Sequence, residues 1–449
     1  MLFVIVLYLC LVAIAAFGPL RWAFIAYLLL STIEFPGDKS AIGLLNATKG
    51  IFLPLYLLWR LRAYSGHRKI VAAPFAWVLL IVYAGIAASW SLFPMAALKM
   101  VGHLTGLLLI CLVFVRATKG GYITPKSLLA LTAGTLALGA SRLLVAPRWA
   151  DDPSRFTSFS PAQGFAAFLA ALFCVGLAAR SIRTNVRILC CSALAAALIL
   201  NGSRIWFVGI VIASLLSVAI SDLRPWMKIC GAGLLTIMVA VLMGAGDRII
   251  DILNEEARSN RIVAAISALY SGDVASSPLG TLRFRRGIDA AGIDQIRNAS
   301  FTELVFGHGT SNGSTITGSL YRSYSRFTDP NRMVHNDWLR IIYEWGLVGF
   351  GLWCTFIVSI VLFAWKGMRL DWAGNSRPLL VYIPAFLTCF AAENFLAGAG
   401  SAATNGFLLL IAFATVSHRH VRHARVMQAA DAVYFRDELH QELLSGSAG

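Results

Sequence analysis

Charged residues are scarce in this sequence. Of its 449 residues, 13% are Asp, Glu, Lys or Arg, whereas 58% are hydrophobic. A typical soluble domain has about 25% charged residues. The charge here is too sparse to cover a soluble surface of this size. The composition therefore excludes a soluble enzyme, a collagen-like chain and a disordered chain.

The sequence also lacks the short motifs of many common enzymes. It contains no HExxH metal motif, no P-loop, no GxSxG nucleophile turn and no dinucleotide-binding fingerprint. Its eight cysteines all lie in apolar runs, without a CxxC pair, and we expect them to act as small core residues. We therefore expect neither a bound metal nor a cofactor.

Long apolar runs dominate the sequence instead. They are continuous rather than alternating, which excludes a β-barrel and predicts an all-α, polytopic membrane protein. We interpret the first run as a span, because it lacks the basic flank and cleavage site of a signal peptide. One of the first two short runs need not cross fully, so we expect twelve or thirteen spans. The predicted spans are 2–17, 22–35, 42–60, 74–92, 96–116, 126–145, 163–180, 187–201, 204–220, 228–245, 346–365, 379–397 and 402–417.

The basic residues of the short loops predict the orientation. Alternate short loops are rich in Lys and Arg, as cytoplasmic loops are, and they hold nearly all of the net charge of +16. The long polar segment 246–336 then lies on the opposite side, which in a bacterial inner membrane is the periplasm. We predict an N-terminal transmembrane bundle (1–245), a periplasmic loop forming a small helical cap (246–337), C-terminal transmembrane helices (338–417) and a cytoplasmic tail (418–449).

Arginine distinguishes the outer face. Segment 246–336 contains ten arginines and no lysine. Planar, permanently charged guanidinium groups suit phosphate oxygens, although most of these arginines could instead be solvated or paired with the nine acids of the segment. The cluster Arg283-Phe284-Arg285-Arg286 is the least easily explained in that way. Arg204 lies between two apolar spans, where a charge is a functional candidate, unless it snorkels outward as an anchor.

Two histidines lie in the same outer region. His335 closes the outer loop just before an apolar helix, and an imidazole is well suited to take a proton near neutral pH. A lone histidine is nevertheless more often structural. His308, in Phe306-Gly307-His308-Gly309, is a second candidate.

Other ionisable residues carry less weight. Asp151 and Asp152, in the short outer loop 146–162, could hold a divalent cation, although two acids on a loop are more often solvated. Four residues in or near the spans are as readily explained by local pairing as by function: Lys99, His103, Arg142 and Glu393.

The stretch His335-Asn336-x-x-Leu339, continuing to Glu344-x-Gly346-Leu347-x-Gly349, resembles the signature of the bacterial O-antigen ligase and O-antigen polymerase superfamily, which includes related exopolysaccharide polymerases. Three further segments are similar to family segments: Gly202-Ser203-Arg204, Phe306-Gly307-x-Gly309 and Arg155-Phe156 before Pro161. Thr157 and Ser158 stand where the family usually has a glycine after Arg-Phe.

The resemblance implies a GT-C-like membrane glycosyltransferase, metal-independent and inverting. Its donor would be a glycan on undecaprenyl diphosphate. Its acceptor would be lipid A-core in an O-antigen ligase, which we favour, or another lipid-linked glycan in a polymerase. By the same resemblance His335 and Arg204 would be catalytic. Arg204, with one or more of Arg283, Arg285 and Arg286, would grip the diphosphate, and Asn336, Arg155 and His308 would support the site.

Two other classes of function remain open. A transporter or flippase of lipid-linked sugars would need charged residues along a central path, but ionisable residues within the spans are few. The charge gathers at one outer face, which favours an enzyme. A non-catalytic scaffold for envelope assembly would give neither His335 nor Arg204 a chemical role. None of these functions requires a nucleic-acid partner.

Overall fold

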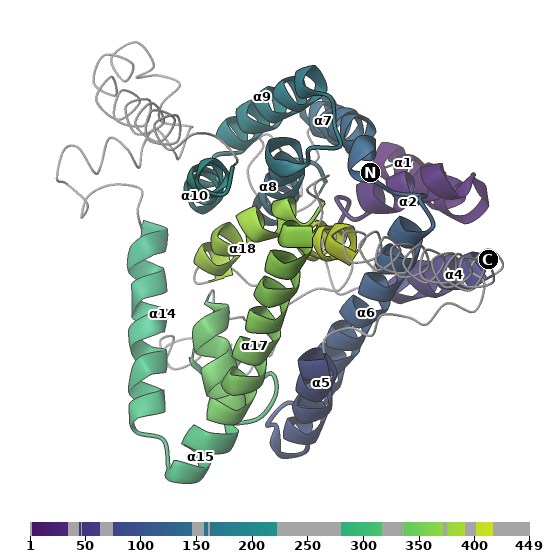
Figure 1. Cartoon of the computed structure of the whole chain (residues 1–449). Helices are drawn as coiled ribbons and strands as arrows, with labels where there is room; N and C mark the ends of the chain where they lie inside the picture. The colour runs from purple at the N-terminus through teal and green to yellow at the C-terminus, as the bar shows by residue number, and fades with distance from the viewer. Residues whose placement is uncertain are drawn as a thin grey trace, which may run out of the picture.

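The computed structural model describes residues 2–34, 45, 47–62, 75–145, 157–159, 162–221, 280–316, 334, 336–370, 375–390 and 401–415. Within these residues every regular element is a helix, and four helices are long and apolar enough to cross a membrane: Pro94–Lys119, Pro125–Val145, Thr184–Asn201 and Asp337–Arg369. Shorter apolar helices lie between and beside them, as Figure 1 shows. The prediction of an all-α, polytopic membrane protein is confirmed. The predicted span 228–245 and the tail 418–449 lie outside the described residues.

The helices of the N-terminal region follow the predicted spans closely. They are α1 (Leu2–Phe17), α2 (Leu20–Leu30), η1 (Thr48–Phe52), α4 (Leu53–Arg62), α5 (Phe75–Ala87), η2 (Ala88–Trp90), α6 (Pro94–Lys119), η3 (Pro125–Ser127), α7 (Leu128–Val145), α8 (Ala162–Ala178), α9 (Thr184–Asn201) and α10 (Arg204–Ala219). The later helices are α14 (Gly280–Arg297), α15 (Phe301–Phe306), α17 (Asp337–Leu370), α18 (Arg377–Phe390) and an apolar helix over Ala402–Thr415.

Helix α8 lies at the centre of the described bundle. Nearly all of its residues are buried, and it packs against α9, α10 and α18. Helices α10 and α18 also pack against each other, with Trp206 stacked on Tyr382 at a ring-centroid distance of 5.9 Å. Gly209 faces Ala385 so closely that a Cβ there would lie 3.1 Å from the alanine Cβ. Small residues thus bring these helices close together, as is common in membranes.

Two arginines of predicted cytoplasmic loops bind the ends of helices. The Arg60 guanidinium donates hydrogen bonds to the carbonyl oxygens of Ala16 (2.8 Å) and Gly18 (2.9 Å), at the end of α1. The Arg187 guanidinium donates to the carbonyl oxygen of Gly176 (2.7 Å), near the end of α8. The last carbonyl groups of a helix have no partner within it and carry partial negative charge. These residues therefore stabilise helix C-termini.

Helix α17 differs from the predicted span 346–365. It begins at Asp337, where Asn336 caps it: the Asn336 side-chain oxygen accepts a hydrogen bond from the Leu339 amide (3.2 Å). Gly346, at φ 61° and ψ −164°, then breaks the helix into segments 337–345 and 347–370. The predicted span 346–365 lies almost entirely in the second segment, whereas the first segment was predicted only as part of the C-terminal transmembrane region 338–417.

Candidate functional site

The start of α17 packs against α14 in a small apolar cluster. The cluster consists of Ile288, Ile316, Val334, Leu339 and Tyr343. Beside it, the Asn336 side-chain amide donates a hydrogen bond to Asp289 Oδ1 on α14 (3.2 Å). Both chain neighbours of position 335 therefore contact α14 or the residues packed on it.

The predicted site residues fall into two groups. His335, Arg155, Asp151, Asp152 and Glu393 lie outside the described residues. Arg204 is the first residue of α10, and Arg283, Arg285 and Arg286 lie in the first turns of α14; for these four the structure describes the backbone alone. Positions 285 and 286 precede Asp289 by one helical turn, so they share its side of α14.

The ionisable residues of the spans have ordinary surroundings. Lys99 is exposed on α6, His103 is half-buried on the same helix, and Arg142 is buried in α7. His103 and Arg142 each have an interaction partner.

The Gly307-x-Gly309 turn binds the end of the first segment of α17. The amides of His308 and Gly309 donate hydrogen bonds to the carbonyl oxygens of Tyr343 (2.9 Å) and Glu344 (3.0 Å). These are among the carbonyl groups that the break at Gly346 leaves without helical partners. The turn therefore supplies the missing donors.

Glycine is required on both sides of this contact. Gly307 has φ +80° and Gly346 has φ +61°, a region that other residues rarely adopt. A Cβ at Gly307 would collide with the Glu344 carbonyl group, and one at Gly346 would collide with the Val305 carbonyl group. The glycines of two family-like motifs, far apart in the sequence, thus face each other where two backbones cross.

A buried ion pair completes this contact. The Glu344 carboxylate accepts hydrogen bonds from the Ser311 amide (2.8 Å), the Gly313 amide (3.1 Å) and Arg340 Nε (2.9 Å). Glu344 is 2% exposed and Arg340 4%. A buried carboxylate needs such partners, because water no longer solvates it. We call Arg340, Glu344 and the turn 307–313 the Glu344 clasp.

The clasp was missed at the level of sequence. Glu344 belongs to the family-like motif, but no role was assigned to it, and Arg340 was not singled out. Their spacing of four residues on one helix is the signal that could have paired them. No sequence spacing predicts that backbone amides of the turn also bind Glu344.

The same turn contacts the N-terminal bundle. The Thr310 hydroxyl donates a hydrogen bond to the Ala84 carbonyl oxygen (2.7 Å), and the Ser91 hydroxyl donates to the Thr310 carbonyl oxygen (2.7 Å). The Asn312 side-chain oxygen accepts from the Leu92 amide (3.0 Å). The sequence predicted both the α5–α6 loop and the turn to face outward, and the structure brings them together.

His308 is half-buried and contacts Tyr343 and Glu303. Its ring stacks on Tyr343 at a centroid distance of 4.1 Å, and Nδ1 lies 3.2 Å from the Tyr343 carbonyl oxygen. Its Nε2 lies 3.9 Å from a carboxylate oxygen of Glu303. These contacts give His308 a packing role beside the clasp, and its supporting role in chemistry stays a prediction.

Glu303 belongs to the capping box that starts α15. Its carboxylate accepts hydrogen bonds from the Ser300 amide (2.8 Å) and hydroxyl (2.7 Å). These hydrogen bonds stabilise the ionised form and hold the pKa of Glu303 below its usual value.

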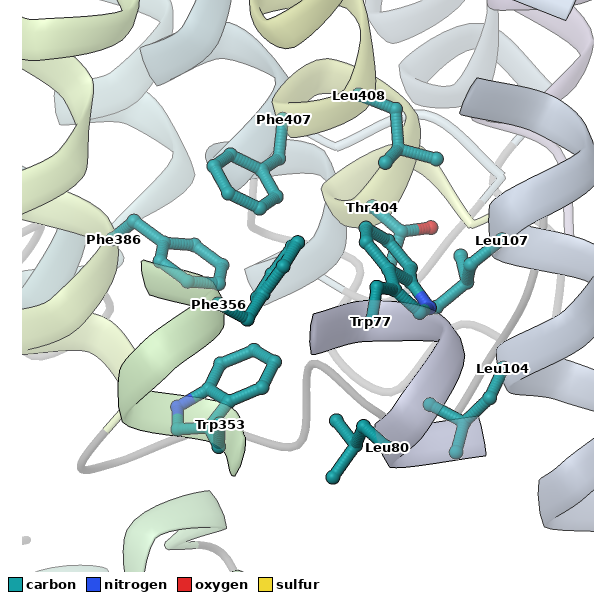
Figure 2. A pocket seen from close by; sticks show the side chains of 10 residues that line it. All are labelled: Trp77, Leu80, Leu104, Leu107, Trp353, Phe356, Phe386, Thr404, Phe407 and Leu408. Carbon is teal, nitrogen blue, oxygen red and sulfur yellow. The ribbon is translucent and has the colours of Figure 1, made fainter. Parts of the chain in front are cut away.

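An apolar cavity of about 30 Å³ lies among the membrane helices (Figure 2). It is lined by Trp77, Leu80, Leu104, Leu107, Trp353, Phe356, Phe386, Thr404, Phe407 and Leu408. Its lining is almost entirely apolar and carries no charged side chain that could bind a diphosphate, so the cavity does not compete with the region around α14 and the start of α17 as the site of chemistry.

A comparison with protein families places these features in context. The family model described as O-antigen ligase matches residues 189–354. That range contains Arg204, the arginines of α14, the Glu344 clasp and the His335-Asn336 pair, whereas Arg155 lies outside it. A comparison with curated proteins gives no match. This match over residues 189–354 supports the resemblance to the O-antigen ligase and polymerase superfamily that the sequence motifs indicate.

Proposed function

We propose that this chain is an inverting, metal-independent glycosyltransferase of a bacterial inner membrane. It transfers a glycan from undecaprenyl diphosphate to an acceptor hydroxyl at the periplasmic face. The observation that carries the proposal is the family match over residues 189–354, which includes the outer arginines and His335. We favour a ligase with a lipid A-core acceptor over a polymerase with a lipid-linked acceptor.

Charge on the leaving group defines the role of the arginines. The acceptor oxygen attacks the anomeric carbon, and the bond from that carbon to the diphosphate oxygen breaks with inversion. Negative charge then develops on the diphosphate. Arg204, with one or more of Arg283, Arg285 and Arg286, stabilises this charge by fixed guanidinium groups at a site partly shielded from water.

His335 acts on the acceptor. Its imidazole accepts the hydroxyl proton as the oxygen–carbon bond forms, or orients that hydroxyl for attack. The Asn336–Asp289 hydrogen bond supports this assignment, because it links the residue after His335 to the helix that carries the three arginines. A lipid-linked donor also explains why the candidates gather beside the membrane rather than in a distant domain.

The first test compares single variants in a purified transfer assay in lipid vesicles. We expect His335→Ala and Arg204→Ala to lower transfer by about 10²-fold or more while the proteins stay folded in the membrane. His418→Ala, in the predicted cytoplasmic tail, and Arg297→Ala, at the far end of α14, serve as matched controls. Near-normal transfer by either test variant would remove the role assigned to that residue.

The three arginines of α14 are separated in the same assay. Each of Arg283, Arg285 and Arg286 is replaced by Ala and by Lys, with Arg297→Ala as the reference on the same helix. An arginine that binds diphosphate in a forked geometry loses activity in both variants, because Lys cannot reproduce two parallel hydrogen bonds. Full activity in all six variants would exclude this cluster from diphosphate binding.

Metal dependence has its own test. Transfer is expected to persist in excess chelator. Loss of transfer in chelator, restored by Mg²⁺, would contradict the metal-free mechanism and return attention to Asp151 and Asp152.

The glycans that accumulate in a strain lacking this protein identify the acceptor. Long glycan chains left unattached to lipid A-core identify a ligase, whereas single repeat units identify a polymerase. A transporter of lipid-linked sugars would move the donor across vesicles without forming a glycosidic bond, which the purified assay detects directly.

A further inference from the structure

Large apolar side chains are exposed where α5, α15 and the break in α17 meet. Phe301 is 79% exposed and Phe306 46%, although both belong to the segment that the sequence assigns to a polar outer loop. Further exposed apolar residues near this corner are Leu92, Met95, Leu347 and Val348. We call these six residues the outer apolar corner.

Hydrogen bonds and backbone contacts bring the three segments of the corner together. The Tyr83 hydroxyl donates a hydrogen bond to the Phe306 carbonyl oxygen (2.9 Å). Gly346, the residue before Leu347, touches the backbone of Val305. Figure 1 shows α15 beside the lower end of α17, where α14 ends. The backbones of α5, α15 and the break in α17 therefore lie next to one another.

The contacts of α15 fix its level relative to the membrane. Tyr83 lies before the end of the apolar helix Phe75–Trp90, between Val82 and Ile86, which are exposed apolar residues of the same helix. At about 1.5 Å per residue this helix is about 24 Å long, less than the ~30 Å hydrocarbon core. We therefore expect the side chains exposed on it to face lipid. The Phe306 carbonyl oxygen is hydrogen-bonded to Tyr83, which lies within this part of the helix.

The polar backbone beside α15 is hidden from lipid. Residues 309–314 are all buried, and their hydrogen bonds run to Ala84, Ser91, Leu92 and Glu344. Irregular backbone at membrane depth is tolerated where protein surrounds it. The segment thus combines an enclosed polar turn with an exposed apolar helix.

We propose that α15 lies in the outer headgroup–acyl boundary and that Phe301 and Phe306 insert into the lipid. The occupant of the outer apolar corner is the bilayer itself, because the corner continues the lipid-facing surface of α5. Residues 301–316 are then an interfacial segment of the outer loop rather than part of a water-exposed cap. The proposal does not depend on the reaction that the chain catalyses.

Photo-crosslinking in vesicles tests this proposal. The photoreactive analogue p-benzoylphenylalanine replaces Phe301 or Phe306 in the full chain, reconstituted in phosphatidylethanolamine and phosphatidylglycerol. Val82 is the lipid-facing reference, and Asp294, exposed on α14, is the water-facing control. After irradiation, intact-mass spectrometry should show at least fivefold more lipid adduct at positions 301 and 306 than at 294. Equal adduct levels would overturn the proposal, and so would crosslinked dimers of the chain in place of lipid adducts.

A spin-label measurement provides an independent check. A nitroxide at position 301 (Phe301→Cys), in a chain whose native cysteines are replaced, should collide more often with oxygen than with a water-soluble nickel chelate. The same label at position 294 should show the reverse preference. A preference for the chelate at 301 would place α15 in water and contradict the proposal.

Discussion

The two segments of α17 belong to one element but have opposite surroundings. Segment 337–345 buries charged residues, among them Arg340 and Glu344, and binds the outer turn. Segment 347–370 exposes apolar residues such as Val358 and Leu362, as a membrane helix does. Gly346 separates the two. The difference shows that hydropathy identifies the second segment, whereas remote partners define the first.

The largest effect is expected from Glu344→Ala. The substitution leaves the buried Arg340 without its carboxylate and two backbone amides of the turn without an acceptor. We expect the free energy of unfolding to fall by about 3–5 kcal/mol. Thermal unfolding in detergent micelles measures this against Lys366→Ala, an exposed charge in the second segment. Equal unfolding temperatures for the two variants would show that the clasp does not stabilise the first segment.

Alanine substitutions at two glycines of α17 compare the break with the second segment. Gly346→Ala places a Cβ against the Val305 carbonyl at positive φ, so we expect a loss of about 1–3 kcal/mol in stability. Gly351→Ala, in the second segment, meets open space and should be neutral or stabilising by up to about 1 kcal/mol. Similar melting temperatures for the two alanine variants would contradict the role given to the break.

Removing one hydroxyl group should have a smaller effect. Tyr83→Phe deletes the hydrogen bond from α5 to the Phe306 carbonyl oxygen, and we expect a loss of about 0.5–1.5 kcal/mol. Thr355→Val removes a hydroxyl that bonds only within the second segment of α17, and it should change stability less. The same thermal assay measures both. A greater loss for Thr355→Val would reverse the order of importance of the two segments.

The smallest expected effect is a dependence of the local stability of α15 on pH. The pKa of Glu303 is lowered by hydrogen bonds from Ser300. The stabilisation that its ionised carboxylate gives to the folded state is therefore present above the unfolded pKa and is lost as pH falls through the folded pKa. Hydrogen exchange of residues 301–306, corrected for intrinsic rates, should therefore quicken in acid. Glu303→Gln should flatten this dependence. An unchanged pH profile in that variant would exclude Glu303 as its origin.

Much of the fold could be predicted from the sequence, because continuous apolar runs of suitable length define membrane helices. Within the predicted helical cap 246–337, the described residues include the helix α14, at Gly280–Arg297. The predicted span 346–365 did not include the first segment of α17, because the charged residues Asp337, Arg340 and Glu344 interrupt the apolar pattern. Glu344 pairs with Arg340 on the same helix and also binds the amides of Ser311 and Gly313, 33 and 31 residues earlier in the chain.

The candidate site was predictable to a lesser extent. The glycines of the outer turn and of the Glu344 motif were noted from the family resemblance, but their mutual contact was not. It depends on two backbones crossing, which no local pattern records. The roles of His335 and of the four arginines stay predictions that the variants above test.

The hydrogen bond between Tyr83 and Phe306 also bears on how the chain is assembled. It joins residues 223 positions apart. Helix α5 is synthesised long before α15, so its outer end cannot acquire this partner until most of the chain has left the ribosome. Contacts of such long sequence separation form late, after the entropy of closing a large loop has been overcome. The outer corner is therefore expected to be among the last parts of the molecule to assemble, and the most sensitive to truncation of the chain before residue 306.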